Sequence, residues 1–501
     1  MNINLVSFNP VPADIAGNTH QILQLLRSPA VQAGELLVLP EAALCGCPLF
    51  DLFEDKQILA QNLSALKEIA KEAKQTACVL GYLEKQAGQV TTAAAFLYKG
   101  KVTKIFDTET IPFQGKNIQF TLESPQMAQA DPDADAVVFL QACSYVKGNV
   151  SGRLDSLKKF AKKHAVPSFL CNLLGGGDGM IFDGLCAAAD KKGSLVLCGE
   201  LFREQVLSFD LEEKYPAVSY TLPVQAELIE ALTFGLQDYA HKSGFDKVVL
   251  GVSGGIDSAF TAALAARALG GESVYCVSLP SYCTSDLSKS LAGQLAVRLG
   301  VNLEEVGVMP AFEAVREALS HIVSHPKDTS EQELQSRLRT NILSALATEL
   351  NAMLLSTDDK SESAVGSFVL YGDAGGSLQP IGDLYKTEIY ELVDFINKKE
   401  ELIPQGIVKR APTSELRPNQ KDEDSLPPYP VLDKILKGYL EEGFSAKDIS
   451  QKNRIRLETV CEVLDRVNRA DLKRRQTAPA LQVTERPFST VLRPIIKKIN
   501  L

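Results

Sequence analysis

Short apolar runs alternate with longer amphipathic segments over the first 215 residues of the chain. The apolar runs have the length and composition of buried strands, at Leu5–Phe8, Leu36–Leu39, Ala77–Tyr82, Ala93–Tyr98, Ala136–Leu140, Ser168–Asn172 and Ser194–Cys198. Three segments repeat apolar residues at helical spacing, namely Asn18–Leu26, Ile58–Lys74 and Leu154–His164. Strands and helices in this order predict a layered α/β domain over residues 1–215.

A similar alternation resumes after a connector at residues 216–225, where Pro216 and Pro223 bracket a short strand-like piece. A helix is predicted over Gln225–Ser243, and the strands and helices that follow it are expected at Val248–Val252, Ser273–Leu279, Thr284–Leu299, Leu334–Leu350 and Ala352–Ser356. Short, continuously apolar strands are typical of parallel sheets that are covered on both faces. The pattern therefore predicts a second α/β domain over residues 226–501.

Composition and charge narrow the classes of function. A chain of 501 residues is too long for one hydrophobic core, so at least two domains are expected. The net charge of −10 argues against nucleic acid as a partner, because a phosphate backbone attracts basic surface. No stretch has the apolar length of a membrane span, and the N-terminal residues lack the features of a secretion signal. The ten cysteines are scattered, mostly in apolar runs, which favours buried free thiols and a cytoplasmic location.

One stretch, Ser253-Gly254-Gly255-Ile256-Asp257-Ser258, has the composition of a phosphate-binding loop. It joins a predicted buried strand to a predicted helix, and its adjacent glycines allow backbone N–H groups to approach a ligand closely. The start of the helix adds free N–H groups and the positive end of the helix dipole. A carboxylate inside a phosphate site needs a cation beside it, so Asp257 indicates Mg²⁺.

This loop resembles the SGGxDS loop of the ATP-pyrophosphatase group, whose members adenylate a carbonyl or carboxyl oxygen and release pyrophosphate. Further motifs follow in the order found in NAD synthetases, at Pro280–Thr284, Leu334–Arg339, Thr357–Glu362, Tyr371–Gly376, Pro380–Thr387, Arg410–Leu426 and Lys473–Gln476. The second domain is therefore similar to NAD synthetases over essentially its whole length. The resemblance implies a Rossmann-like, doubly wound parallel sheet.

The resemblance also implies roles for individual residues. ATP, as co-substrate, would be bound by the phosphate loop together with Thr357, Lys386 and Thr413. Asp257 and Glu362 would hold Mg²⁺ and, with Lys386, form the catalytic centre. One carboxylate from each of two strand ends suits an ion that keeps water and phosphate oxygens as its other ligands. The segment 411–426 resembles the loop that closes over ATP in this family.

Four residues correspond to family positions that contact the substrate, deamido-NAD, namely Arg337, Asp373, Lys473 and Arg474. Arg337 and Arg339 lie two residues apart and cannot share a helix face, so they are expected to serve different partners. Gly382 replaces a lysine that is common in the glutamine-using branch, which removes one positive charge.

The first domain resembles nitrilase-type amidohydrolases through Leu39-Pro40-Glu41 and Phe182-Asp183-Gly184, which implies an αββα sandwich. That family hydrolyses amides with a Glu–Lys–Cys triad. Glu41 occupies the position of the general base, but Thr108 stands where the lysine is expected, and residues 121–135 are polar and lack a cysteine. Cys143 is the one substitute nearby, and we interpret it as structural. Without a thiolate nucleophile no acyl-enzyme forms, so Glu41 and Thr108 are expected to be vestiges of a glutaminase.

The combined resemblance implies an ATP- and Mg²⁺-dependent NAD synthetase. It would amidate deamido-NAD with free ammonia and release AMP and pyrophosphate. Two alternatives remain open: use of glutamine through an unrecognised nucleophile, and a non-catalytic nucleotide-sensing relative. The expected partners are small molecules, with neither nucleic acid nor membrane, and the family resemblance implies a homo-oligomer that is at least a dimer.

Overall fold

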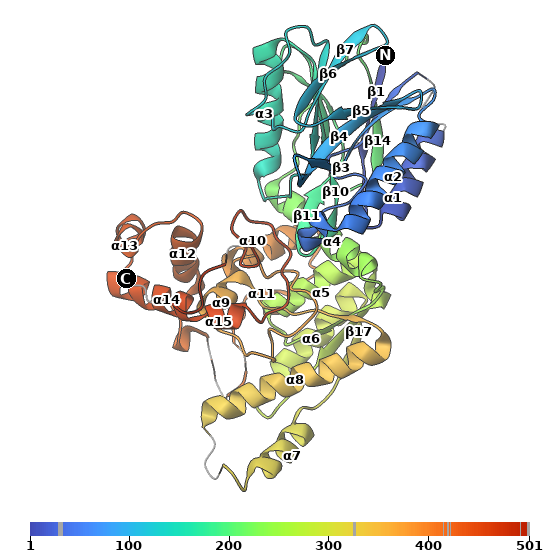
Figure 1. Ribbon diagram of the computed structural model, residues 1–501. Helices are drawn as coiled ribbons and strands as arrows, with labels where there is room; N and C mark the ends of the chain where they lie inside the picture. Colours follow the sequence, from blue (N-terminus) through green and yellow to red (C-terminus); the bar gives the residue numbers. More distant parts are fainter. Residues whose placement is uncertain are drawn as a thin grey trace. The chain divides into compact units, whose positions relative to one another are not determined.

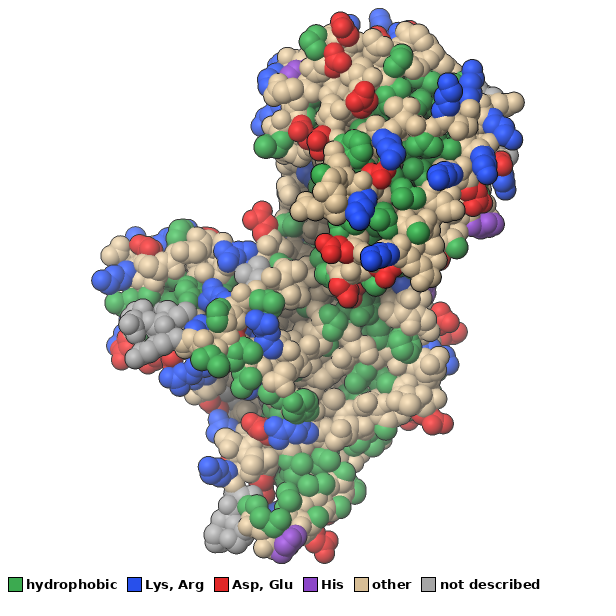
Figure 2. All heavy atoms as spheres, in the orientation of Figure 1, with side chains coloured by type: hydrophobic (Ala, Val, Ile, Leu, Met, Phe, Trp, Pro, Cys, Tyr) green, Lys and Arg blue, Asp and Glu red, His purple; other side chains and the backbone are tan. Residues whose placement is uncertain are grey.

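The computed structural model describes residues 1–28, 34–323, 327–413, 415–417, 420, 422–490 and 492–497. The chain forms two compact units, unit 1 (Met1–Glu227) and unit 2 (Leu228–Leu501), which Figure 1 colours from blue to green and from green to red. On the face shown in Figure 2, acidic and basic side chains are interspersed over both units. Within the described ranges, the structure has no helix that is both long enough and apolar enough to cross a membrane.

Unit 1 contains two six-stranded sheets and a two-stranded ribbon. The first sheet has the order β14 (Gln205–Asp210), β1 (Asn2–Ser7), β2 (Leu36–Val38), β3 (Ala77–Gln86), β4 (Gln89–Tyr98) and β5 (Lys101–Ile105). The second has the order β13 (Leu195–Cys198), β12 (Cys186–Ala189), β9 (Ser168–Asn172), β8 (Ala136–Gln141), β7 (Lys116–Thr121) and β6 (Thr108–Phe113). The ribbon pairs β10 (Leu174–Gly177) with β11 (Met180–Asp183).

The strands of unit 1 are buried on alternate faces. In β1, Ile3 and Leu5 join a core that includes side chains of both sheets, whereas Val6 joins a second core beneath two helices. These helices are α1 (Ile15–Arg27) and α2 (Lys56–Glu72), while α3 (Asn149–His164) packs against the second sheet. A short 3₁₀ helix, η1 (Phe50–Glu54), precedes α2. The resulting layers form an αββα sandwich and confirm the predicted fold class.

The predicted elements of unit 1 are all present, with ends that differ by a few residues. The pattern missed seven strands, namely β5, β6, β7, β10, β11, β12 and β14. Of these, β5 and β6 are largely exposed and carry mixed polar side chains, and β10, β11 and β12 have only four residues each. The strand-like piece expected between Pro216 and Pro223 is wrong, since residues 214–223 have no regular secondary structure. Residues 217–219 are exposed, and the two prolines lack the N–H groups that a ladder requires.

Unit 2 is built on a four-stranded parallel sheet with the order β17 (Asn302–Glu305), β16 (Val274–Ser278), β15 (Val248–Gly251) and β18 (Met353–Leu354). The helices around it are α4 (Val224–Lys242), α5 (Ile256–Leu269), α6 (Asp286–Leu299), α7 (Met309–Leu319) and α8 (Asp328–Leu350), with η2 at Gly271–Ser273. The chain begins at β15, moves outward through β16 and β17, and returns to the opposite side for β18. This reversal is the predicted doubly wound arrangement, and it creates a crevice at the carboxyl ends of β15 and β18.

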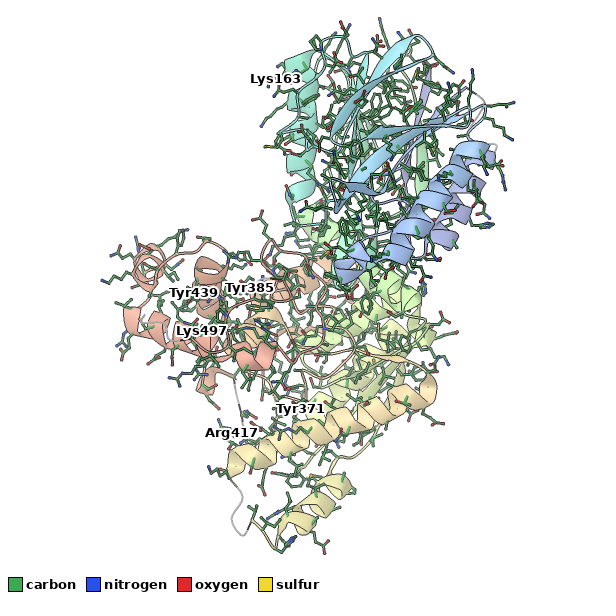
Figure 3. The ribbon with its side chains drawn as sticks, in the orientation of Figure 1. Lys163, Tyr371, Tyr385, Arg417, Tyr439 and Lys497 are labelled. Atoms are coloured by element: carbon green, nitrogen blue, oxygen red, sulfur yellow. The ribbon has the colours of Figure 1, made fainter. Side chains whose placement is uncertain are left out.

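The rest of unit 2 is a helical region that follows β18. Its elements are α9 (Lys360–Val365), α10 (Lys386–Asn397), α11 (Gln405–Val408), η3 (Asp422–Asp424), α12 (Tyr429–Leu440), α13 (Ala446–Asn453), α14 (Leu457–Arg469) and α15 (Asp471–Arg474). Apolar side chains of α9, α12 and α14 share one core, and the buried Tyr385 belongs to it (Figure 3). This region anchors α9 and α10, which carry residues of the site described below.

A buried ion pair ties α9 to the C-terminal segment. The Lys360 ammonium lies 2.9 Å from Asp383 Oδ1 and 3.0 Å from Glu441 Oε1, and it donates to Thr484 Oγ1. Asp383 also accepts the backbone N–H groups of Val483 and Thr484. Lys360 and Asp383 are almost completely removed from solvent, so each charge depends on the other for compensation.

We predict that Lys360→Met lowers the free energy of unfolding by about 3–5 kcal/mol, because it leaves Asp383 as a buried charge without a cation. The exposed pair Lys452–Glu442 supplies the control. Lys452→Met is expected to cost less than about 1 kcal/mol. Denaturant unfolding of both variants checks this, and equal shifts would contradict the structural role given to Lys360.

Candidate active site

A cavity of about 220 Å³ lies in unit 2 at the carboxyl ends of β15, β16 and β18. Its walls include the predicted phosphate loop and side chains from α6, α8 and the segment after α11. Seven residues singled out from the sequence line it: Ser253, Asp257, Ser258, Thr357, Glu362, Asp373 and Thr413. Gly255 and Ile256 line an adjoining smaller cavity with Asp257, Glu362 and Thr413. Residues far apart in the sequence therefore converge at the edge of the sheet where ligands bind in this fold.

The phosphate loop owes its shape to one glycine and two serines. Gly254 has φ +72°, and a Cβ atom there would lie 2.7 Å from the backbone oxygen of Ser288, so a larger residue would be strained and would clash. Ser258 Oγ donates to Gly255 O and accepts the N–H of Ser253. The N-cap residue of α5 is Gly255, which has no side chain to accept a hydrogen bond from the first turn.

The Lys386 ammonium lies among three carboxylates. It is 2.7 Å from Asp257 Oδ2, 3.0 Å from Asp359 Oδ2 and 2.9 Å from Glu362 Oε1. Burial disfavours the charged form of the completely buried Lys386, but the three carboxylates outweigh this and raise its pKa well above the usual value. Burial raises the pKa of Asp359 to about 7 and that of Glu362 well above its usual value, and a further cation would favour the charged forms of both.

Local sequence explains how two of these carboxylates are placed. Asp359 is the N-cap of α9, and its side chain accepts the N–H of Glu362 at 2.8 Å. The Glu362 side chain accepts the N–H of Asp359 in return, which completes a capping box. The turn between β18 and α9 therefore fixes both side chains. The sequence motif indicated Glu362 but not Asp359, whose capping position could have signalled its role.

The motif Arg337–Arg339 divides as helix geometry predicts, but the arginine that lines the cavity is Arg339. Arg339 Nε donates to Leu279 O at 3.0 Å. Arg337 instead bonds to Leu370 O and Glu333 and lines neither of the two cavities at the phosphate loop. Periodicity separated the two side chains without indicating which of them faces the cavity.

Lys473 and Arg474 also lie away from these cavities. Lys473 Nζ donates to the carbonyl oxygens of Gly366 and Phe368, and Arg474 bonds to Ala364 O and Asp471. Both side chains thus fasten α15 to the end of α9. Near them, Tyr371 is 66% exposed beside α8, and its hydroxyl contacts Gln476 (Figure 3).

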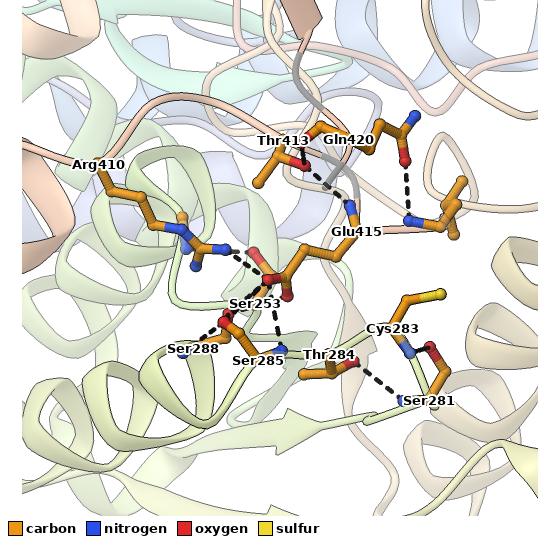
Figure 4. Close-up of polar contacts among 12 residues, drawn as sticks. Ser253, Ser281, Cys283, Thr284, Ser285, Ser288, Arg410, Thr413, Glu415 and Gln420 are labelled. Atoms are coloured by element: carbon orange, nitrogen blue, oxygen red, sulfur yellow. Dashed lines mark hydrogen bonds and ion pairs between the residues drawn. The ribbon is translucent and has the colours of Figure 1, made fainter. Parts of the chain in front are cut away.

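The segment that carries Thr413 is fastened over the cavity by Glu415. Its carboxylate accepts hydrogen bonds from Ser285 Oγ at 3.0 Å and Ser288 Oγ at 2.9 Å, and it pairs with Arg410 at 2.6 Å (Figure 4). The anionic side chain lies at the N-terminus of α6, where the helix dipole favours it. Positions 414, 418, 419 and 421 of the expected closing loop lie outside the described residues.

Unit 1 holds the residues expected to be vestiges of a glutaminase. Glu41 is half-buried, and burial raises its pKa. Thr108 is exposed on β6, where its hydroxyl contacts Thr121 rather than Glu41. Cys143 is an exposed residue, and its backbone N–H and carbonyl are hydrogen-bonded to the Asn172 side chain. Neighbouring atoms partly remove its thiol from water, and this raises the pKa of the thiol although the nearby Arg153 opposes the shift. A raised thiol pKa disfavours the thiolate that a nucleophile requires.

The segment of unit 1 that joins β7 to β8 is short. Strand β7 ends at Thr121 and β8 begins at Ala136, and the described residues between them form no strand.

In the ranges that the structure describes, no cluster of three or more His, Cys, Asp or Glu side chains has the arrangement of a metal site.

Comparisons with known proteins agree with this division. The NAD synthase family profile matches residues 228–477, and the carbon-nitrogen hydrolase profile matches residues 2–114. Glutamine-dependent NAD(+) synthetases of Synechocystis sp. and Thermotoga maritima are 33% and 30% identical to the chain, and each alignment covers 97% of both proteins.

Solved structures support the fold over the whole chain. The glutamine-dependent NAD+ synthetase of Acinetobacter baumannii, in complex with ADP, has a TM-score of 0.75 at 29% identity and covers 99% of this chain and 98% of its own. A glutamine-dependent NAD(+) synthetase from Cytophaga hutchinsonii has a TM-score of 0.86 at 20% identity, with the same coverage, and supports the fold alone. The chain belongs to the NAD synthetase family, ligases that form a carbon–nitrogen bond, and carries a carbon-nitrogen hydrolase domain ahead of its synthetase domain.

Proposed function

We propose that unit 2 amidates deamido-NAD in two steps and takes its nitrogen from free ammonia. A carboxylate oxygen of the nicotinate group attacks the α-phosphorus of ATP, the bond to the β-phosphate oxygen breaks, and pyrophosphate leaves. Ammonia then attacks the carbonyl carbon of the adenylate, the bond to the phosphate oxygen breaks, and AMP leaves as the nitrogen loses a proton. The observation that carries this proposal is the convergence of the phosphate loop, Asp257 and Glu362 at one cavity, with both carboxylates paired to the buried Lys386.

The residues of this site serve mainly to bind and neutralise phosphates. The N–H groups of the phosphate loop and of the first turn of α5 would bind an anion, and Thr357 and Thr413 line the cavity beside them. Lys386 is completely buried and compensates the carboxylates. Such fixed charges stabilise the charge that develops on the leaving groups without general acid–base chemistry.

Asp257 and Glu362 are suited to hold Mg²⁺. Asp257 Oδ1 is buried and has no hydrogen-bond partner among the residues that the structure describes, and the Lys386 ammonium contacts both carboxylates. Oxygen donors from two elements, completed by phosphate and water, match the preference of this ion. Bound there, Mg²⁺ would neutralise phosphate charge and help to orient ATP.

The nitrogen source is inferred from unit 1. Thr108 stands in place of a lysine, β7 runs directly to β8 through residues that contain no cysteine, and the carbon-nitrogen hydrolase match ends at residue 114. These features support a hydrolase domain that does not release ammonia from glutamine. The second candidate is glutamine use through Cys143. It is favoured by the names of the full-length relatives and by the nearness of Glu41, although the charge of Glu41 adds to the rise in the pKa of the thiol that burial causes.

We predict that Asp257→Ala lowers the rate of NAD formation by at least about 100-fold, because it removes a carboxylate from the phosphate site. Asp246→Ala, at an exposed position just before β15, is the matched control and should keep the wild-type rate. Product assays for NAD, AMP and pyrophosphate check this. Wild-type turnover in Asp257→Ala would contradict the site, and a wild-type protein that makes no AMP would favour a nucleotide sensor.

We predict that ammonium supports NAD synthesis by the purified protein and that glutamine, freed of ammonium, does not. Cys143→Ala should leave the ammonium-dependent rate unchanged, since the thiol lies in unit 1 and its pKa is raised. Rates with each nitrogen donor, together with glutamate release, measure this. Glutamine-driven synthesis that disappears in Cys143→Ala would overturn the ammonia proposal and establish Cys143 as the nucleophile.

A further inference from the structure

One face of helix α12 supports the Lys386 centre from outside the two cavities at the phosphate loop. Tyr429, Asp433 and Lys437 are spaced four residues apart, so they lie on the same face of this helix. The Lys386 ammonium lies 5.0 Å from the centroid of the Tyr429 ring. Lys437 Nζ lies 3.0 Å from Oε1 of Glu388, in the first turn of α10. None of the three side chains lines either cavity, so this face acts on the site through other residues.

Asp433, in the middle of this face, holds the beginning of α10. Backbone N–H groups at the start of a helix have no acceptor within the helix. In α10, the N–H of Thr387 donates to Asp433 Oδ2 at 2.9 Å, and the N–H of Lys386 donates to Ser361 Oγ at 2.9 Å. Ser361 Oγ in turn donates to Asp433 Oδ1 at 2.6 Å. One carboxylate therefore accounts, directly or through Ser361, for the first two N–H groups of α10.

The same hydrogen bonds hold the beginning of α9. Ser361 lies in the first turn of α9, directly before Glu362. Ser361 is completely buried and Asp433 is 2% exposed, so a lost hydrogen bond between them is not simply replaced by one to water. Burial raises the pKa of Asp433, and the hydrogen bonds from Ser361 and Thr387 oppose this rise because they favour the carboxylate. Asp433 thus joins the first turns of the helices that supply Glu362 and Lys386.

We propose that Asp433 is a positioning residue for adenylation, which sets the contact between Lys386 and Glu362 by way of Ser361. Lys386 Nζ lies 2.9 Å from Glu362 Oε1, and Ser361 fixes the backbone on both sides of this contact. A displacement of the start of α10 by about 1 Å would misplace these charges beside the phosphate loop. This inference rests on the proposed function and deepens it, because it adds a residue that acts on the reaction without touching the substrate.

The test measures Asp433→Ala, which removes both acceptor atoms. The kcat for NAD formation should fall about 10- to 100-fold, and so should the rate of ATP–pyrophosphate exchange with deamido-NAD, which needs no nitrogen donor. The KM for deamido-NAD should stay within about twofold, because α12 does not line the cavity. Asp433→Asn keeps one acceptor oxygen for the N–H of Thr387 and should recover part of the lost rate.

A second variant tests whether Asp433 acts through Ser361. Ser361→Ala breaks the same chain of hydrogen bonds and should also slow the exchange. The double variant Asp433→Ala/Ser361→Ala should be at most about twofold slower than Asp433→Ala, because residues that form one network have non-additive effects. Losses that multiply would show two separate effects and would contradict this chain.

Leu436→Ala, on the same helix, is the matched control for stability. It removes a completely buried side chain from the core that α9, α12 and α14 share, so it should lower the melting temperature at least as much as Asp433→Ala does. Its kcat and KM should stay at the wild-type values. If kcat falls in both variants in step with the melting temperature, Asp433 has only a structural role. Should Asp433→Ala fail to fold, Asp433→Asn and Ser361→Ala supply the same comparison.

The exchange assay separates the failure of this inference from that of the proposed function. Wild-type exchange that is unchanged in Asp433→Ala would remove Asp433 from positioning and leave the proposed function standing. A raised KM for deamido-NAD at unchanged kcat would place the effect in substrate binding and contradict the inference in the same way. A wild-type protein that catalyses no exchange would overturn adenylation itself and, with it, the role of Asp433.

Discussion

The site depends on one buried ammonium among three carboxylates. Lys386 begins α10, Asp257 lies in the first turn of α5, and Asp359 and Glu362 form the capping box of α9, so this single contact joins three helices to the end of the sheet. A lysine with no exposed surface is tolerated only because the carboxylates compensate it. The carboxylates are in turn held together only because the lysine offsets their repulsion. Two of these carboxylates, Asp257 and Glu362, also line the cavity.

How far the sequence could predict this arrangement depends on the range of each interaction. The strand–loop–helix at Ser253–Ser258 and the acidic turn before α9 are local patterns; the first was predicted from the residues themselves and the second from the family resemblance. The contact of Lys386 with Asp359 joins the ends of two segments separated by the whole Tyr371–Gly376 loop, and no periodicity indicates it. Arg339 shows the same limit, since helical spacing separated it from Arg337 but could not show which of them faces the cavity.

The two units differ in what their folds require. In unit 1 the core is made by strands that alternate their apolar side chains between the two sheets and the helix layer, and Thr108 lies outside it on an exposed strand. The core of the αββα sandwich therefore does not depend on the side chain at position 108. In unit 2 the polar residues of the site are themselves structural: the capping box fixes the turn, and Lys386 is buried. Loss of the site would affect the fold of unit 2 far more than it would affect unit 1.

The central claim is that unit 2 activates a carboxylate by transferring AMP to it. The most direct measurement uses deamido-NAD labelled with ¹⁸O in the nicotinate carboxylate, turned over with ATP and ammonium, with mass analysis of the released nucleotide. The account predicts that AMP carries one ¹⁸O atom for each NAD formed, because the carboxylate oxygen that attacks the α-phosphorus leaves with it. Unlabelled AMP, or ADP with labelled phosphate, would contradict adenylation at this site.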